Sequence, residues 1–118
     1  MAATKTSRTI KASASNAAGA TASGTELDLS TKYGATLAAR ITNGGTGPTI
    51  GCDFVVYVGD ATGVKREFSR QTGPTTNSAI TDFVVEIPPS AMFINVDFTG
   101  NTGQAVTVEC YGEELTTI

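Results

Sequence analysis

The sequence predicts an all-β fold, an antiparallel β-sandwich or jelly roll with an extended N-terminal arm. Three observations lead to this prediction. Apolar and polar residues alternate with a period of two through most of the chain after residue 25, as in half-buried strands. Clusters of Gly, Pro and Asn interrupt these runs at nearly regular spacing, and no convincing helical period is present. The 118 residues, which include 20 Thr and 13 Gly, suit one domain rich in strands and turns.

Residues 1–25 are predicted to form an arm distinct from the sandwich domain of residues 26–118. Residues 4–14 could form one short strand, and beyond Asn16 the segment to residue 24 contains only Ala, Gly, Ser and Thr. Such small side chains cannot offset the ordering entropy by self-burial, so we expect the arm to be flexible until it docks. Ile10 is its best apolar anchor, and Arg8 and Lys11 lie close by. These three are the candidate partner-binding residues of the arm.

The first strands of the sandwich follow the arm. Leu27 and Leu29 alternate with Asp28, and residues 36–41 alternate as a half-buried strand. The Gly-rich run at 43–48 reads as a loop. Residues 52–58 are apolar on both faces, which is typical of a central strand.

Residues 65–71 are predicted to return beside this central strand as a hairpin, after a turn at 59–63. Phe68 is their only large apolar side chain, which suits an edge strand protected by charge. The charged residues Lys65, Arg66 and Arg70 are therefore read mainly as a solubility device, and also as a second candidate partner-binding surface.

Three further runs bring the predicted total to seven or eight strands. Residues 80–87 alternate and end at two prolines. Residues 92–98 and 106–111 are the clearest strands, and a Gly-rich turn at 100–103 separates them.

Two cysteines, Cys52 and Cys110, fall in the apolar phase of their strands, where a thiol behaves as a small hydrophobic group. We expect both to be buried and reduced, although a disulfide between them stays open. The chain contains no His, which excludes histidine-based catalysis, and the two cysteines lack the paired spacing of a zinc site.

Charge and hydropathy argue against several classes of partner. The net charge of −3 provides no field that attracts nucleic acid or an anionic membrane. The first 25 residues contain no apolar run long enough for a signal peptide or a membrane span, so we expect a protein made in the cytoplasm.

No pattern of residues predicts a catalytic or cofactor site. The glycines at 44–47 are not followed by the Lys-Ser/Thr pair of a phosphate loop. Asp82 and Glu86 share a strand face but lie roughly 13 Å apart at about 3.3 Å per residue, too far for a glycosidase pair. Acids from neighbouring strands stay open as a hydrolase hypothesis, as does a structural calcium ion. Three tyrosines on separate segments give thin support to a carbohydrate-binding platform: Tyr33, Tyr57 and Tyr111.

Several phrases resemble a group of small structural proteins encoded among tailed-bacteriophage head and tail genes. These are GPTIGCDFVVYVGD, KREFSRQTG, FVVEIPPSAMFINVDFTGNTGQAVTVE and the closing YGEEL, and the resemblance covers most of residues 7–118. In that group the stretch SRTIKASASNAAGA is an arm and the remainder is a β-sandwich. Members include capsid decoration, or cement, proteins.

The resemblance implies a non-enzymatic virion protein on the capsid exterior, made in the host cytoplasm, with no cofactor. It would bind the major capsid protein through the arm and stabilise the shell by many repeated weak contacts. We also expect a homo-oligomer, a dimer or a trimer, and no nucleic acid or membrane partner. The alternatives are a phage tail, baseplate or receptor-binding component, and a carbohydrate-binding β-sandwich module.

Overall fold

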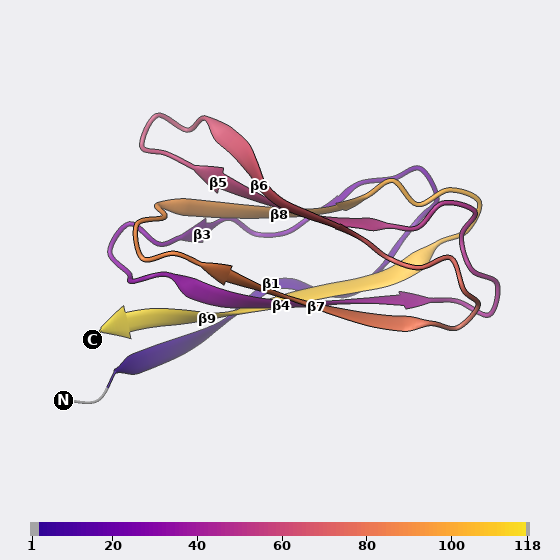
Figure 1. Ribbon diagram of the computed structural model, residues 1–118, viewed down its shortest axis with the longest axis horizontal. Helices are drawn as coiled ribbons and strands as arrows, with labels where there is room; N and C mark the ends of the chain where they lie inside the picture. The colour runs from indigo at the N-terminus through magenta and orange to yellow at the C-terminus, as the bar shows by residue number, and fades with distance from the viewer. Residues whose placement is uncertain (1–2, 118) are drawn as a thin grey trace.

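Two antiparallel sheets packed face to face make up the computed structural model, which describes residues 3–117 (Figure 1). The four-stranded sheet has the order β1-β9-β4-β7. Its strands are β1 (Thr4–Asn16), β9 (Val106–Thr117), β4 (Ala35–Asn43) and β7 (Ile80–Ile87). The strands β1 and β7 are its edges.

The five-stranded sheet has the order β2-β8-β5-β6, with β3 also paired to β8. Its strands are β2 (Ala22–Ser23), β3 (Leu27–Asp28), β5 (Asp53–Gly59), β6 (Lys65–Thr72) and β8 (Phe93–Thr99). The described residues contain strands, turns and bends, and the predicted all-β sandwich is confirmed.

The core lies between the two sheets and follows the period-two pattern of the sequence. Alternate residues of each strand face inward, so Phe54 of β5 stacks on Phe98 of β8 at 5.2 Å between ring centroids, and on Phe83 of β7 at 5.9 Å. The second contact joins the two sheets, because β7 and β5 belong to different layers. Stacked aromatic pairs of this kind add specificity to the burial of apolar surface.

The hairpin and the edge strand predicted for residues 52–71 are both present. Strand β5 pairs antiparallel with β6 on one side and with β8 on the other, and β6 ends the sheet. A register shift at Val56 and Tyr57 leaves Phe68 out of the one-to-one pairing. An edge strand interrupted in this way is a poor template for pairing with another chain.

The N-terminal segment differs from the predicted arm. Thr4–Asn16 forms β1 and pairs along β9, and the chain then crosses to the other layer, where it forms β2 and β3 (Figure 1). Ile10 is 4% exposed and belongs to the core between the sheets. Residues 4–25 are therefore part of the sandwich, whereas we expected them to lie outside it.

Two glycines explain how a segment of small residues finds a place in the core. A Cβ on Gly112 would lie 3.2 Å from Cδ1 of Ile10, and one on Gly24 would lie 2.7 Å from its Cγ2. Their missing side chains leave room for this one large apolar group. The amide of Thr25 also donates to the carbonyl of Ile10 at 2.8 Å. This backbone hydrogen bond holds the segment in place in addition to the burial of the Ile10 side chain.

Candidate functional site

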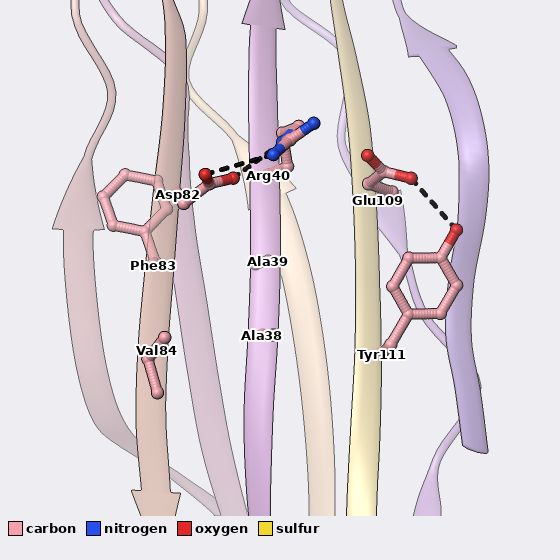
Figure 2. Close-up of a pocket in the computed structure, with 8 residues that line it drawn as sticks. All are labelled: Ala38, Ala39, Arg40, Asp82, Phe83, Val84, Glu109 and Tyr111. Atoms are coloured by element: carbon pink, nitrogen blue, oxygen red, sulfur yellow. Dashed lines mark hydrogen bonds and ion pairs between the residues drawn. The ribbon is translucent and has the colours of Figure 1, made fainter. Parts of the chain in front are cut away.

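A hollow of about 410 Å³ lies on the outer face of the four-stranded sheet, across β7, β4 and β9. We call it the outer hollow. Figure 2 shows that its residues come from three neighbouring strands. It is lined by Ala38, Ala39, Arg40, Asp82, Phe83, Val84, Glu109 and Tyr111.

The floor of the outer hollow is set by one small residue between two larger ones. Ala38 on β4 lies directly opposite Val84 on β7 and Tyr111 on β9. Val84 is 65% exposed and Tyr111 is 41% exposed. Since side chains directly opposite on a sheet stand about 5 Å apart, the single methyl group of Ala38 leaves a depression between them.

The next row of the same face is ionic. Arg40 on β4 lies opposite both Asp82 and Glu109 (Figure 2). Its Nε donates to Oδ1 of Asp82 at 2.7 Å and its Nη2 donates to Oδ2 at 3.2 Å. This bidentate hydrogen bond holds the pKa of Asp82 below its usual value and raises the pKa of Arg40.

Glu109 orients the tyrosine of the outer hollow. The hydroxyl of Tyr111 donates to Oε2 of Glu109 at 3.0 Å, and this hydrogen bond raises the pKa of the phenol (Figure 2). The hydroxyl of Tyr111 is thus satisfied within the chain while the residue stays 41% exposed. A tyrosine fixed in this way loses little conformational entropy when a partner covers it.

The outer face of the five-stranded sheet is built differently. Val55 of β5 lies opposite Arg70 and Asp97 and is fully buried, although it alternates with the core residues Phe54 and Val56. Beside it, Arg70 pairs with Asp53 at 2.7 Å and with Glu67 at 2.9 Å. Ion pairs therefore close this face over its central valine.

The charged strand β6 takes part in these internal contacts. Arg66 pairs with Asp60 at 3.3 Å, and Nζ of Lys65 lies 5.9 Å from the centre of the Tyr57 ring. Together with Arg70, these residues lie on the edge strand that we predicted. All three predicted partner-binding cations of β6 thus have a contact within the chain.

The three candidate residues of the arm do not share one exposed surface. Ile10 is in the core. Arg8 donates from Nε to Oε2 of the buried Glu114 at 3.1 Å, and Lys11 is half-buried at a register shift opposite Cys110. The physical reason is that β9 is long enough to pair with the whole segment, which places Ile10 in the core and Arg8 beside Glu114.

The other side chains considered from the sequence are also dispersed. Tyr57 and Tyr111 belong to different sheets, and Tyr33 lies in the connection before β4. They form no common platform for a sugar. Asp82 and Glu109 are separated by the intervening strand, which puts their strands about 10 Å apart at 4.7 to 4.9 Å per strand spacing.

Both thiols are buried and free, as the sequence predicted. Burial raises the pKa of Cys110 to about 12. It also raises the pKa of Cys52 to about 11, with a smaller contribution from the charge of Asp53. Neither thiol is therefore a nucleophile at neutral pH.

Two further searches covered the described part of the chain. Residues 3–117 hold no group of three or more His, Cys, Asp or Glu side chains placed to bind a metal ion. Over the same residues, no helix has the length and apolar character needed to cross a membrane.

The sequence patterns did not identify the outer hollow. Its signal was present, because Val84 and Tyr111 are apolar or aromatic residues in the outward phase of their strands. The strand order was needed to see that both flank Ala38, since the three residues are far apart in the chain.

No protein-family model matches this chain, and none of the curated proteins matches it. Solved structures do match. The K3 cleaved adhesin domain of Lys-gingipain from Porphyromonas gingivalis aligns with a TM-score of 0.58 at 13% identity, over 84% of this chain and 71% of that one. A chain of the T13 viral particle of infectious bursal disease virus aligns with a TM-score of 0.62 at 10% identity.

That viral match covers 96% of this chain and 31% of the viral chain, so this protein spans about a third of its length. The SPBc2 prophage-derived protein YomS aligns with a TM-score of 0.50 at 18% identity, over 96% of both chains. These likenesses establish a shared β-sandwich fold of the jelly-roll type that occurs in a viral particle, a prophage-derived protein and an adhesin domain.

Proposed function

We propose that this protein is a non-enzymatic component of a bacteriophage virion that binds the major capsid protein and stabilises the shell from outside. The observation that carries the proposal is the outer hollow, an exposed sheet face with Val84 and Tyr111 on either side of Ala38. Ligand pockets for small molecules enclose most of their ligand, whereas a depression on an open sheet suits the protruding side chains of another protein.

Three further points support the proposal. The sequence phrases resemble small virion proteins of tailed phages, and the fold occurs in a viral particle and in a prophage-derived protein of the same size range. The sandwich can also act without an anchoring arm, because a shell repeats each contact many times. Many modest contacts then resist the pressure of the packaged genome together.

A second candidate is a tail or receptor-binding component that contacts the host surface. The observation in its favour is the likeness to the adhesin domain of Lys-gingipain. Such a protein would present its loops outward and would not bind heads. A homo-oligomer on a symmetry axis is compatible with either candidate.

Co-sedimentation tests the proposal. The purified full chain is mixed with mature heads of the phage that encodes it, stripped of accessory proteins, and in parallel with purified tails. Saturable binding to heads, together with raised resistance of the heads to heat, is the expected result. Binding to tails alone would move the protein to the second candidate, and binding to neither would contradict both.

A further inference from the structure

Three exposed large apolar or aromatic side chains lie on the outer face of the four-stranded sheet. Val84 and Ile80 of β7 are 65% and 60% exposed, and Tyr111 of β9 is 41% exposed. Side chains at alternate positions of β7 point to the same face, so Ile80 and Val84 share it with the outer hollow. Exposed apolar groups that cluster in this way mark interaction sites on soluble proteins.

The same face is acidic. The outward positions of β4, β7 and β9 hold one guanidinium, that of Arg40, and four carboxylates: Asp82, Glu86, Glu109 and Glu113. One further cation, Lys5 of the edge strand β1, lines a neighbouring hollow with Glu86 and Glu113, so the carboxylates still outnumber the cations. Arg40 is engaged with Asp82. Glu86 and Glu113 lie on either side of Thr36, in the row next to Val84, Ala38 and Tyr111.

The five-stranded sheet differs at its centre, and its exposed large apolar residue in the described strands, Phe68 at 46%, lies on the edge strand β6. Its outward valine, Val55, is 0% exposed, compared with 65% for Val84. Its carboxylates Asp53 and Glu67 are paired with Arg70. The centre of one broad face is therefore covered beside its valine by ion pairs, whereas the centre of the opposite face is apolar and has carboxylates in the neighbouring rows.

We propose that the outer hollow is the docking face, and that its occupant is a protein segment with an apolar side chain flanked by Arg or Lys. The apolar group would fill the space above Ala38, between Val84 and Tyr111. The flanking cations would meet Glu86, Glu113 and Glu109. The identity of the segment as part of the capsid protein rests on the proposed function, whereas its chemistry rests on this face.

Charge complementarity selects this occupant over a second copy of the chain. Two copies packed through the same face would bring like carboxylates together, which is unfavourable in a desolvated interface. A cationic partner instead gains from each of these groups, and its association slows and weakens as salt rises.

The test mixes the full chain with each of two tetrapeptide amides, acetyl-Arg-Phe-Leu-Arg and acetyl-Glu-Phe-Leu-Glu. Binding is measured from changes in the backbone amide chemical shifts of the protein in NMR spectra. The basic peptide should shift Ala38, Val84 and Tyr111 in a saturable way and leave Val55 unmoved. The effect should weaken between 50 and about 500 mM salt, as screening requires. The acidic peptide should shift none of them.

Two arginine variants make the test specific. Ala38→Arg fills the hollow with a cationic side chain and should weaken binding of the basic peptide by at least about tenfold. Ser23→Arg adds the same charge at an exposed position of β2 in the other sheet and should leave binding unchanged. If Ala38→Arg does not fold, Glu86→Gln combined with Glu113→Gln replaces it, with Glu26→Gln combined with Asp97→Asn as the charge-matched control.

The proposal is overturned if both peptides act alike, if the shifts lie elsewhere, if no shift occurs, or if Ala38→Arg binds as the wild type does. This experiment contains no capsid. A chain that binds the basic peptide but not stripped heads would keep the docking face and contradict the proposed function. If the Ala38→Arg variant binds heads as well as the wild type does, the proposed function is kept and the docking face is contradicted.

Discussion

Arg8 and Glu114 form an ion pair between the first and the last strand of the sandwich. The Nε to Oε2 distance is 3.1 Å, and the Glu114 side chain is 3% exposed whereas that of Arg8 is 51% exposed. A carboxylate buried to this degree needs a partner, because its charge has lost most of its water. The N-terminal segment supplies that partner, which ties it to the folded domain.

Replacing Arg8 by Met should destabilise the protein. The change leaves the Glu114 carboxylate buried without its hydrogen-bond donor, and we expect a loss of about 1–3 kcal/mol in the free energy of unfolding. Urea denaturation measures it. Arg66→Met is the control, because the ion pair of Arg66 with Asp60 is exposed on both sides and should contribute little. Equal effects of the two changes would contradict the structural role of Arg8.

Replacing Ile10 by Ala should also impair folding. Its side chain lies in the core against the positions of Gly24 and Gly112, so truncation opens a cavity. Losses of this kind amount to about 2–5 kcal/mol, measured by the same denaturation. Thr9→Ala, at an exposed position of the same strand, is the control. An unchanged stability of Ile10→Ala would restore the interpretation of this segment as a free arm.

Most strands could be predicted from the sequence because the alternation of apolar and polar residues is a local pattern. The role of β1 could not, because it depends on pairing with a strand far away in the sequence. Residues 4–16 have too few large apolar groups to signal a core strand. Their place depends on β9, about a hundred residues later, and on the space that Gly112 leaves for Ile10. The outer hollow was hidden for the same reason, since Ala38 gains its meaning only beside Val84 and Tyr111.

The buried thiols should make stability depend on pH in the alkaline range. The pKa values of Cys52 and Cys110 are raised from 9.0 to about 11 and about 12. The unfolded chain therefore loses its thiol protons first, so the free energy of unfolding is unaffected by these groups below about pH 9 and falls as pH rises further. Denaturation curves between pH 8 and about pH 10.5 measure this slope.

A variant with both cysteines changed to Ala isolates the thiol contribution, since other groups titrate in the same range. Its free energy of unfolding should fall less steeply with rising pH than that of the wild type. In the native wild-type chain at pH 8, a thiol-specific disulfide reagent should react slowly, and in urea both cysteines should react at once. Rapid labelling of the native chain would show that the thiols are accessible.

Asn101 should be important for closing one end of the sandwich. It is fully buried, accepts from Nδ2 of Asn16 at 2.9 Å, and donates from its own Nδ2 to the carbonyls of Asn16 and Gln104. Asn101→Ala removes these hydrogen bonds from a buried site and should lower the unfolding free energy by about 2–4 kcal/mol. Asn77→Ala, which removes one exposed hydrogen bond to Gly47, is the control. A loss no larger than that of the control would contradict the account of this network.

The most direct measurement of the central claim is binding to stripped phage heads by three proteins: the wild type, Ala38→Arg and Ser23→Arg. The account predicts saturable binding by the wild type and by Ser23→Arg, and at least about tenfold weaker binding by Ala38→Arg with an unchanged melting temperature. Equal binding by all three would contradict docking through the outer face of the four-stranded sheet. Absence of binding by the wild type would contradict the proposed role on the capsid.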